Sequence, residues 1–218
     1  MLVDAVDQTA LADADRHHLE RVLRLRAGDE LTIADGRGRW RPCRLGGGGA
    51  LEPIGEVVAD PPPSPPIAVA FALVKGERPE WTVQKLTELG ADRIIPFTAV
   101  RSVVQWSEPH KHVERLRRVA REAACQAHRA WLPVVEDLAT FADLAARPGA
   151  VMADRDGTAP LALAPLVLVG PEGGWSDEER AAGRPRMRLG PHVLRAETAS
   201  IAVGAVLAAL RDGLVAPR

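Results

Sequence analysis

The sequence is short of several features, and each shortage excludes a class of protein. Its 218 residues include two cysteines, Cys43 and Cys125, too few for a disulfide framework or a structural zinc site. It has no run of about 18 apolar residues, so no membrane-spanning helix is expected. The first residues lack the basic and apolar stretches of a secretory signal. We therefore expect a cytoplasmic protein that binds neither a membrane nor a metal.

Lysine is also scarce, and the chain has no excess of positive charge. Only three of the 28 basic residues are lysine. The 28 basic residues face 29 acidic ones, which gives a formal net charge of −1. This balance excludes a globally basic nucleic-acid binder but not a local basic face. The apolar share of 46% is enough to bury a core.

Several common catalytic and nucleotide-binding motifs are absent. The sequence contains no G-x-x-x-x-G-K-[ST] phosphate loop and no G-x-G-x-x-G that opens a helix after a strand. It also lacks the G-x-S-x-G turn of α/β-hydrolases. A bound small molecule would therefore not be held mainly through phosphates.

A proline-rich segment divides the chain. Five of the seven residues from Asp60 to Pro66 are proline, which excludes a helix interior or a central strand and favours an extended linker. We expect one domain at 1–60, a linker at 61–66 and a second domain at 67–218.

The first segment is predicted to be a small β-structure. Residues 30–34 alternate in period two, a turn signal follows at 35–38, and 39–45 continue as the partner strand. Residues 51–58 are a further strand candidate, and 15–24 have helical periodicity. Strands this short are typical of a small barrel or compact sheet.

The second segment alternates strands and helices, which predicts an α/β domain with a mostly parallel sheet. Strands are expected at 67–74, 93–97, 133–135, 150–153, 166–169 and 186–189. Helices are expected at 81–89, 110–129, 137–146, after a capping box formed by Ser176 and Glu179, and at 196–210. The last helix carries no charge from Thr198 to Leu210 and is too short to cross a bilayer, so we expect a partner subunit to cover it.

Two glycine-containing segments follow predicted strands. They are Gly-Pro-Glu-Gly-Gly at 170–174 and Leu-Gly-Pro-His-Val-Leu-Arg-Ala-Glu-Thr-Ala at 189–199. In open α/β sheets ligands bind beyond the carboxyl ends of the strands, where glycine lets the backbone approach a ligand closely. Taken singly, either segment could equally be an ordinary strand-to-helix turn.

Together these segments resemble the RsmE family, the 16S ribosomal RNA (uracil-N3) methyltransferases of the SPOUT superfamily. The resemblance extends over nearly the whole chain, through Lys75-Gly76-Glu77-Arg78, the block at 84–90, Arg101-Ser102-Val103, and Ala123 to Arg129. It departs from the family at Cys125, where the family often has Glu, and at the first strand, where Met1-Leu2-Val3 replaces a strand with arginine and an aromatic residue.

The resemblance implies a fold, a cofactor and partners. A PUA-like barrel would contact RNA, and a SPOUT domain with a trefoil knot would bind S-adenosylmethionine. The partners would be 16S ribosomal RNA in the small ribosomal subunit and a second copy of the chain. The implied cofactor-binding residues are Val169, Gly170, Pro171, Glu172, Gly173, Gly174, Leu189, Gly190, Val193, Leu194, Thr198 and Ala199.

The reaction sets the candidate catalytic residues. N3 of uracil must lose its proton before it attacks the methyl group, so a cation could favour the uracil anion and a carboxylate could accept the proton. We assign Arg195 to the anion or a phosphate, and Glu197 or Glu172 to proton acceptance or loop support. Alternatively, both glutamates only bond backbone amides, Glu197 near a helix N-terminus.

RNA contact would come from local basic groups. The candidates for phosphate contacts are Arg21, Arg24, Arg37, Arg39, Arg41, Lys75 and Arg129, with a solvated surface as the alternative for each. Two other functions stay open: a SPOUT methyltransferase for a different RNA site, and a non-catalytic RNA-binding factor of ribosome assembly.

Overall fold

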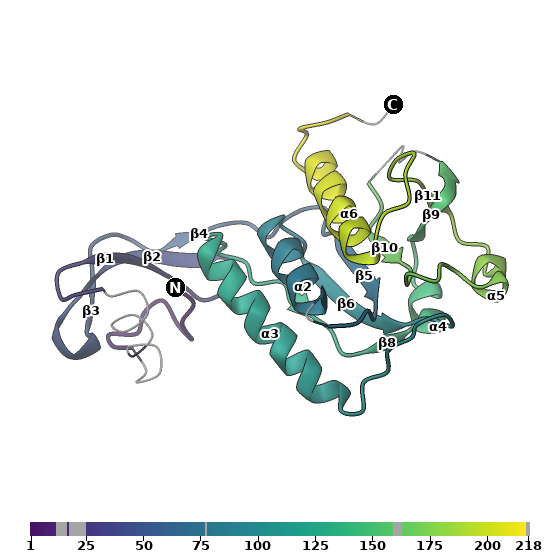
Figure 1. The fold of residues 1–218 in the computed structure, drawn as a ribbon. Helices are drawn as coiled ribbons and strands as arrows, with labels where there is room; N and C mark the ends of the chain where they lie inside the picture. The colour runs from purple at the N-terminus through teal and green to yellow at the C-terminus, as the bar shows by residue number, and fades with distance from the viewer. Residues whose placement is uncertain (12–16, 18–24, 77, 159–162, 217–218) are drawn as a thin grey trace. The chain divides into compact units, whose positions relative to one another are not determined.

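The computed structural model describes residues 1–11, 17, 25–76, 78–158 and 163–216. The chain divides into two compact units (Figure 1). The first comprises Met1–Pro62 and Ala124–Leu132, and the second Pro63–Ala123 and Pro133–Arg218. Apart from His17, the predicted helix at 15–24 lies outside the described residues, and Arg21 and Arg24 lie there with it.

The first unit is built on a four-stranded antiparallel sheet. Strands β1 (Glu30–Ala34) and β2 (Arg39–Leu45) pair as the sequence predicts, with Ala34 opposite Trp40. Strand β3 (Leu51–Pro53) pairs with the end of β2 and β4 (Val58–Ala59) with its start, while a short 3-10 turn, η2 (Gly47–Gly49), joins β2 to β3. No pairing of β1 with β3 or β4 is seen in the part of the chain described, so a closed barrel stays a prediction.

The prediction of one strand at 51–58 is wrong, because the chain bends around Pro42. The backbone N–H of Ile54 donates to the Pro42 carbonyl over 3.1 Å. A Cβ on Gly55 would lie 2.6 Å from the Pro42 ring, so only glycine allows this approach. The two halves of the segment therefore pair with opposite ends of β2.

The core of the first unit follows the alternation of its strands. Ile33, Cys43, Leu45 and Leu51 are buried against Val3. Cys43 is 1% exposed and fills apolar space, and burial raises the pKa of its thiol.

The second unit contains a seven-stranded, wholly parallel sheet. Its main path is β11 (Arg186–Met187), β9 (Ala150–Thr158), β10 (Leu166–Val169), β5 (Ala68–Ala72), β6 (Arg93–Thr98) and β7 (Val134–Val135), and β8 (Ala139–Thr140) also pairs with β6. Every residue of β5 and β10 is buried, as expected for strands covered on both faces. The predicted α/β class with a mostly parallel sheet is confirmed.

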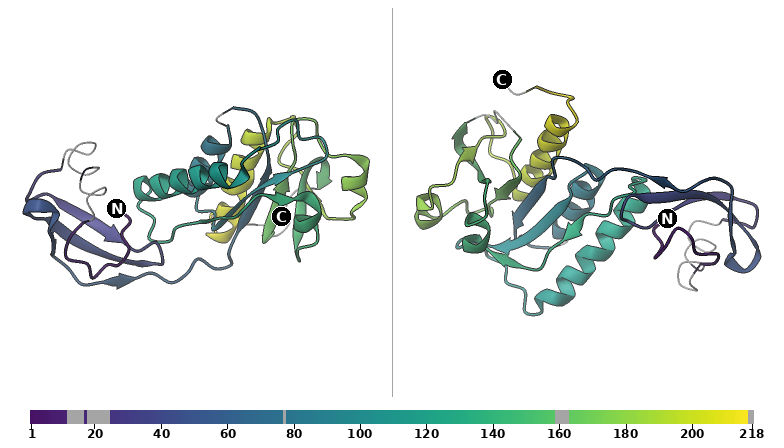
Figure 2. Two further views of the ribbon diagram at one scale, coloured as in Figure 1. Left: turned by 90° about the horizontal axis from the view of Figure 1, so that it is seen from below. Right: turned by 180° about the vertical axis from the view of Figure 1, so that it is seen from behind.

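Helices cover both faces of this sheet (Figures 1 and 2). On one face, α2 (Arg78–Glu88), α3 (Pro109–Gln126) and α6 (Ala196–Arg211) pack on the odd-numbered residues of β5. On the other face, α4 (Phe141–Ala145) and Trp175 pack on the even-numbered alanines of β5, and α5 (Asp177–Ala181) follows Trp175. The capping box predicted at Ser176 and Glu179 begins α5.

Several other predicted elements differ from the structure, and the strand expected at 150–153 continues to Thr158 as β9. The helix expected at 110–129 ends at Gln126, because His128 adopts a left-handed φ of 54°. The helix expected at 137–146 is strand β8 followed by α4, since the Thr140 hydroxyl caps the N–H of Asp143 and starts the helix there. The strand expected at 186–189 stops at Met187, where its pairing with β9 shifts register.

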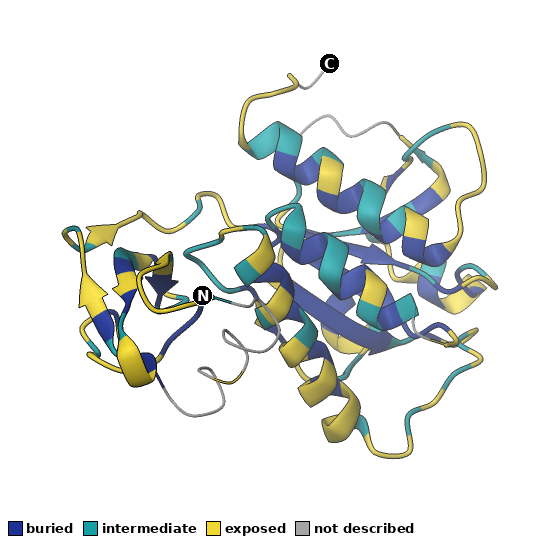
Figure 3. Ribbon diagram, turned by 60° about the vertical axis from the view of Figure 1, so that its left-hand side comes forward, coloured by how far each residue is buried: buried dark blue, intermediate teal, exposed yellow. Residues whose placement is uncertain are grey.

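Helix α6 is buried along one face only. Val203, Gly204, Leu207 and Ala208 are buried, whereas Ala205 on the opposite side is exposed. Figure 3 shows that buried, intermediate and exposed segments alternate along this helix. Ala196 is also buried, and the other apolar residues of the helix are half-buried. A subunit that covers this side stays a prediction.

Candidate active site

The site lies at the carboxyl edge of the parallel sheet. Neighbouring strands β9, β10 and β5 run in one direction, so Asp154 within β9, Gly170 after β10 and Lys75 after β5 lie towards the same edge. The loop from Arg188 to Arg195 joins β11 to α6 beside them. The chain order reverses between β5 and β10, the position at which open α/β sheets bind ligands.

A cavity of about 240 Å³ opens at this edge. Ten of the twelve predicted cofactor residues line it: Val169, Gly170, Pro171, Glu172, Gly174, Leu189, Gly190, Val193, Leu194 and Ala199. Gly173 and Thr198 are not among the lining residues. The structure thus brings the two glycine segments together around one space.

Eight further residues line the cavity that were not predicted from the sequence. They are Ala153, Asp154, Arg155, Trp175, Arg180, Arg188, His192 and Ala196. Ala153, Asp154 and Arg155 line the cavity because Ala153 is in register with Val169 across the β9–β10 pair. The carboxyl end of the neighbouring predicted strand was the signal that could have found them.

Gly170 fits the site because it has no side chain. A Cβ there would lie 2.9 Å from the Trp175 ring. That ring is 3% exposed, stacks on Phe97 and donates its Nε1–H to the Ala153 carbonyl over 2.9 Å. Trp175 therefore packs in the core and fixes the position of the first glycine loop.

Two side chains tie this loop to the segment after β6. The buried carboxylate of Glu179 accepts hydrogen bonds from the N–H groups of Ser176 and Val100, over 2.8 and 2.9 Å. The Arg101 guanidinium donates to the Gly173 carbonyl over 3.2 Å. These contacts hold Gly173 by its backbone from outside the cavity.

Arg78 joins the two candidate glutamates. Its Nη1 pairs with Glu172 of the first glycine loop, and its Nε lies 3.7 Å from Oε1 of Glu197 in the first turn of α6. The Glu197 side chain is 8% exposed, and its Oε2 is buried with no hydrogen-bond partner among the described residues. Both glutamates are thus salt-bridged to Arg78.

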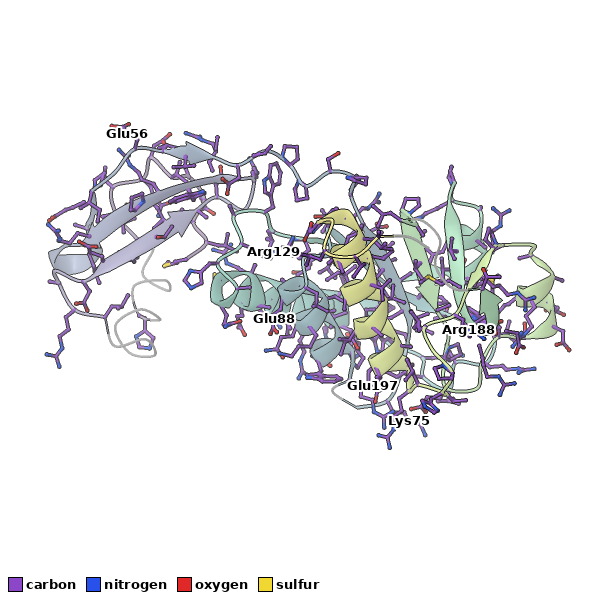
Figure 4. The ribbon with its side chains drawn as sticks, turned by 90° about the horizontal axis from the view of Figure 1, so that it is seen from above. Glu56, Lys75, Glu88, Arg129, Arg188 and Glu197 are labelled. Atoms are coloured by element: carbon purple, nitrogen blue, oxygen red, sulfur yellow. The ribbon has the colours of Figure 1, made fainter. Side chains whose placement is uncertain are left out.

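Two of the predicted cations, Arg195 and Lys75, do not line the cavity, whereas Arg188 does. Arg195 is exposed and is the N-cap residue of α6, immediately before the lining residue Ala196. Figure 4 shows Lys75 near Glu197 at the N-terminal end of α6 and Arg188 at the loop that leads to it. Arg188 is exposed, lines the cavity and fixes its backbone by an N–H donated to the Thr158 carbonyl over 2.7 Å.

A second charged cluster forms the wall nearest β9. The carboxylate of Asp154 is almost fully buried, and its Oδ2 lies 2.8 Å from Arg180 and 3.6 Å from Arg186. Its Oδ1 accepts the backbone N–H of Asp156. This wall therefore presents a carboxylate whose position is fixed by two cations.

The basic residues predicted for RNA contact are divided between the units. In the first unit Arg37 and Arg39 are exposed, and Arg39 pairs with Asp7 over 3.4 Å, while Arg41 donates to the Gly55 carbonyl. Arg129 belongs to the same unit and is half-buried. Lys75 belongs to the second unit, at the carboxyl edge of the sheet.

Over the described residues, no three His, Cys, Asp or Glu side chains come together as metal ligands would. Among the helices of that same part of the chain, none has both the length and the apolarity to span a membrane.

Comparisons with known proteins agree on one family. A family model described as an RNA methyltransferase domain matches residues 61–208, and one described as an RNA methyltransferase PUA domain matches residues 11–51. The ribosomal RNA small subunit methyltransferase E of Mycobacterium tuberculosis is 34% identical, over 94% of this chain and 89% of that protein. The protein of the same name from Bacillus subtilis is 32% identical, over 85% and 83%.

A solved structure shows the same arrangement. The ribosomal RNA small subunit methyltransferase E of Neisseria gonorrhoeae, bound to S-adenosyl methionine, superposes with a TM-score of 0.82 at 26% identity, over 96% of each chain. The match of the methyltransferase model to most of the second unit, and that of the curated relatives to nearly the whole chain, show that this chain belongs to the ribosomal RNA small subunit methyltransferase E family.

Proposed function

We propose that this protein transfers a methyl group from S-adenosylmethionine to N3 of a uridine in 16S ribosomal RNA of the small subunit. The names of its relatives support ribosomal RNA of the small subunit as the substrate. The relative solved with S-adenosyl methionine supports the methyl donor. The observation that carries the proposal is the cavity in which both glycine segments meet.

The residues present fit this cofactor. Val169, Leu189, Val193 and Leu194 give the cavity an apolar wall suited to an adenine ring. Asp154 and Glu172, each already paired with an arginine, leave carboxylate oxygens on the lining that could accept hydrogen bonds from the hydroxyl and ammonium groups of the donor. The bound donor would supply an electrophilic methyl carbon, and no metal is required.

The chain's own groups would prepare the uracil. When N3 attacks, a nitrogen–carbon bond forms, the carbon–sulfur bond breaks and the N3 proton must leave. We assign Arg195 to the developing uracil anion or the adjacent phosphate, and Glu172, which lines the cavity, to proton acceptance. Glu197 would support the site through Arg78, since it does not line the cavity.

The first unit and a second copy of the chain would complete the enzyme. We propose that the domain at 1–60 is a PUA-like RNA-binding domain, the segment at 61–66 a linker and the domain at 67–218 the knotted SPOUT catalytic domain. Arg37, Arg39 and Arg129 would contact phosphates. The half-exposed apolar side of α6, with exposed Leu214 beyond it, supports a homodimer.

Mapping of methylated uridines by mass spectrometry tests this function. Ribosomal RNA from cells that lack the protein should lose one N3-methyluridine of 16S RNA, and the wild-type gene should restore it. Arg195→Ala should fail to restore the mark while its product still binds S-adenosylmethionine. Restoration of a mark at another base would make the protein a methyltransferase for a different site. If cells that lack the protein lose no methyl mark, that result would contradict methylation altogether.

A further inference from the structure

A second cavity, of about 310 Å³, lies wholly within the first unit. This volume is at the lower end of the range for small-ligand sites, about 300–1,000 Å³. Its floor is apolar and consists of the buried residues Leu2, Ala34 and Ala124. Its polar sides are formed by Trp40 of β2, by Asp60 immediately after β4 and by Arg129 in the turn after α3.

Asp60 is held at this cavity by three hydrogen bonds, although the residue is exposed. Its N–H donates to the Gly38 carbonyl over 2.8 Å, and its carbonyl accepts the Trp131 Nε1–H over 3.1 Å. Its Oδ2 accepts the Trp40 Nε1–H over 3.0 Å. A carboxylate has about four lone-pair positions, so this one can still accept from a ligand while its direction stays fixed.

The opposite side is positioned by the end of α3. His128 is at the left-handed φ of 54°, and the Arg129 N–H donates back to the Ala124 carbonyl over 2.9 Å. The next residue, Ala130, accepts the N–H of Gly38 over 3.0 Å, which fastens this turn to the strand hairpin. Arg129, a residue whose guanidinium can donate hydrogen bonds, thereby lines the same cavity as Asp60.

We propose that this cavity binds one unpaired guanine of the ribosomal RNA. This proposal rests on the proposed function and adds to it a site that recognises one base. Guanine offers the N1–H and N2–H donors to a carboxylate such as Asp60, and the O6 and N7 acceptors to a guanidinium such as Arg129. The face of Trp40 and the apolar floor fit an unstacked purine ring. Adenine, cytosine and uracil each lack one part of this pattern.

Indole resonances in a ¹H–¹⁵N NMR spectrum of the full chain report on both cavities at once. The Trp40 signal is assigned from Trp40→Phe, and the probes are guanosine, adenosine, uridine and cytidine 5′-monophosphate. Guanosine monophosphate should shift the Trp40 signal saturably. S-adenosylmethionine should shift the Trp175 signal, which checks the proposed function independently.

Two variants and one control sharpen the test. Asp60→Asn replaces an acceptor oxygen by a donor and should weaken the binding of guanosine monophosphate about 10-fold. Cys125→Phe places a ring in the cavity from its half-buried wall position and should abolish the shift, with folding checked by the unchanged Trp175 signal. Glu56→Gln removes an exposed carboxylate of the same unit that does not line the cavity and should change nothing (Figure 4).

Each outcome decides the inference. A saturable Trp40 shift by guanosine monophosphate alone, lost in Cys125→Phe, supports it. A stronger response to another nucleotide, or no response while S-adenosylmethionine still shifts Trp175, overturns it and leaves the proposed methyltransferase intact. If S-adenosylmethionine moves no signal, the proposed function fails first, and a surviving guanosine site would have to serve another activity.

Discussion

Substitutions at two glycines of the cofactor cavity should affect the stability of the protein differently while both lower its affinity for the methyl donor. Gly170 has no room for a methyl group, because its Cβ would lie 2.9 Å from the buried Trp175 ring. Gly190 lines the same cavity, yet a Cβ there meets no protein atom within 4 Å. We therefore compare Gly170→Ala with Gly190→Ala.

The expected magnitudes follow from packing. The Trp175 ring cannot move away freely, since it is hydrogen-bonded to Ala153 and stacked on Phe97. Overpacking of this kind costs about 1–3 kcal/mol, which lowers Tm by about 2–12 °C for a chain of this size. Gly190→Ala should change stability by less than about 0.5 kcal/mol.

Thermal unfolding and titration calorimetry with S-adenosylmethionine measure the two effects. Both variants should lose affinity, because Gly190→Ala places a methyl group where we expect the donor to approach the backbone and Gly170→Ala pushes the first glycine loop away from the Trp175 ring. Gly47→Ala, whose Cβ also meets nothing within 4 Å, is the control in the other unit and should retain both properties. Full affinity in Gly190→Ala would refute the assignment of this loop to the cofactor.

Three other perturbations test particular contacts. Arg78→Met should lower the free energy of unfolding by about 1–3 kcal/mol, because it leaves the buried Glu197 carboxylate without its cation. Denaturant unfolding measures this loss, and a smaller loss when Glu197→Gln is already present would confirm that the two residues are coupled. N-ethylmaleimide should modify half-buried Cys125 much faster than Cys43, whose pKa is raised by burial, as peptide mass mapping would show. The side-chain and backbone hydrogen bonds from the N-cap of α4 lower the pKa of Asp143, so its contribution to stability is complete above its ordinary pKa and is lost as pH falls through the lowered one; Asp143→Asn should remove that acid-side loss in pH-dependent unfolding.

The sequence was most informative where local chemistry decides the structure. The alternation at 30–34 and 39–45 and the turn between them predicted β1 and β2 to the residue. The run at 166–169 predicted β10, and the Ser176 capping box the start of α5. In each case neighbouring residues determine the outcome, so a single sequence contains the necessary information.

Contacts between distant segments were the part that a single sequence could not supply. The pairing of Arg78 with Glu172 joins residues 94 positions apart. Asp154 enters the cofactor cavity only because β9 pairs with β10. The cavity of the first unit likewise needs the turn at Arg129 to return to a hairpin formed much earlier in the chain. Periodicity within a segment has no bearing on any of these contacts.

The crystal structure of this chain grown with S-adenosylmethionine is the most direct test of the account. We predict the donor between the backbone of Gly170 to Gly174 and that of Leu189 to Leu194, with its adenine against the apolar wall. Donor density elsewhere on the protein, or an unchanged empty cavity at saturating donor, would contradict the central claim.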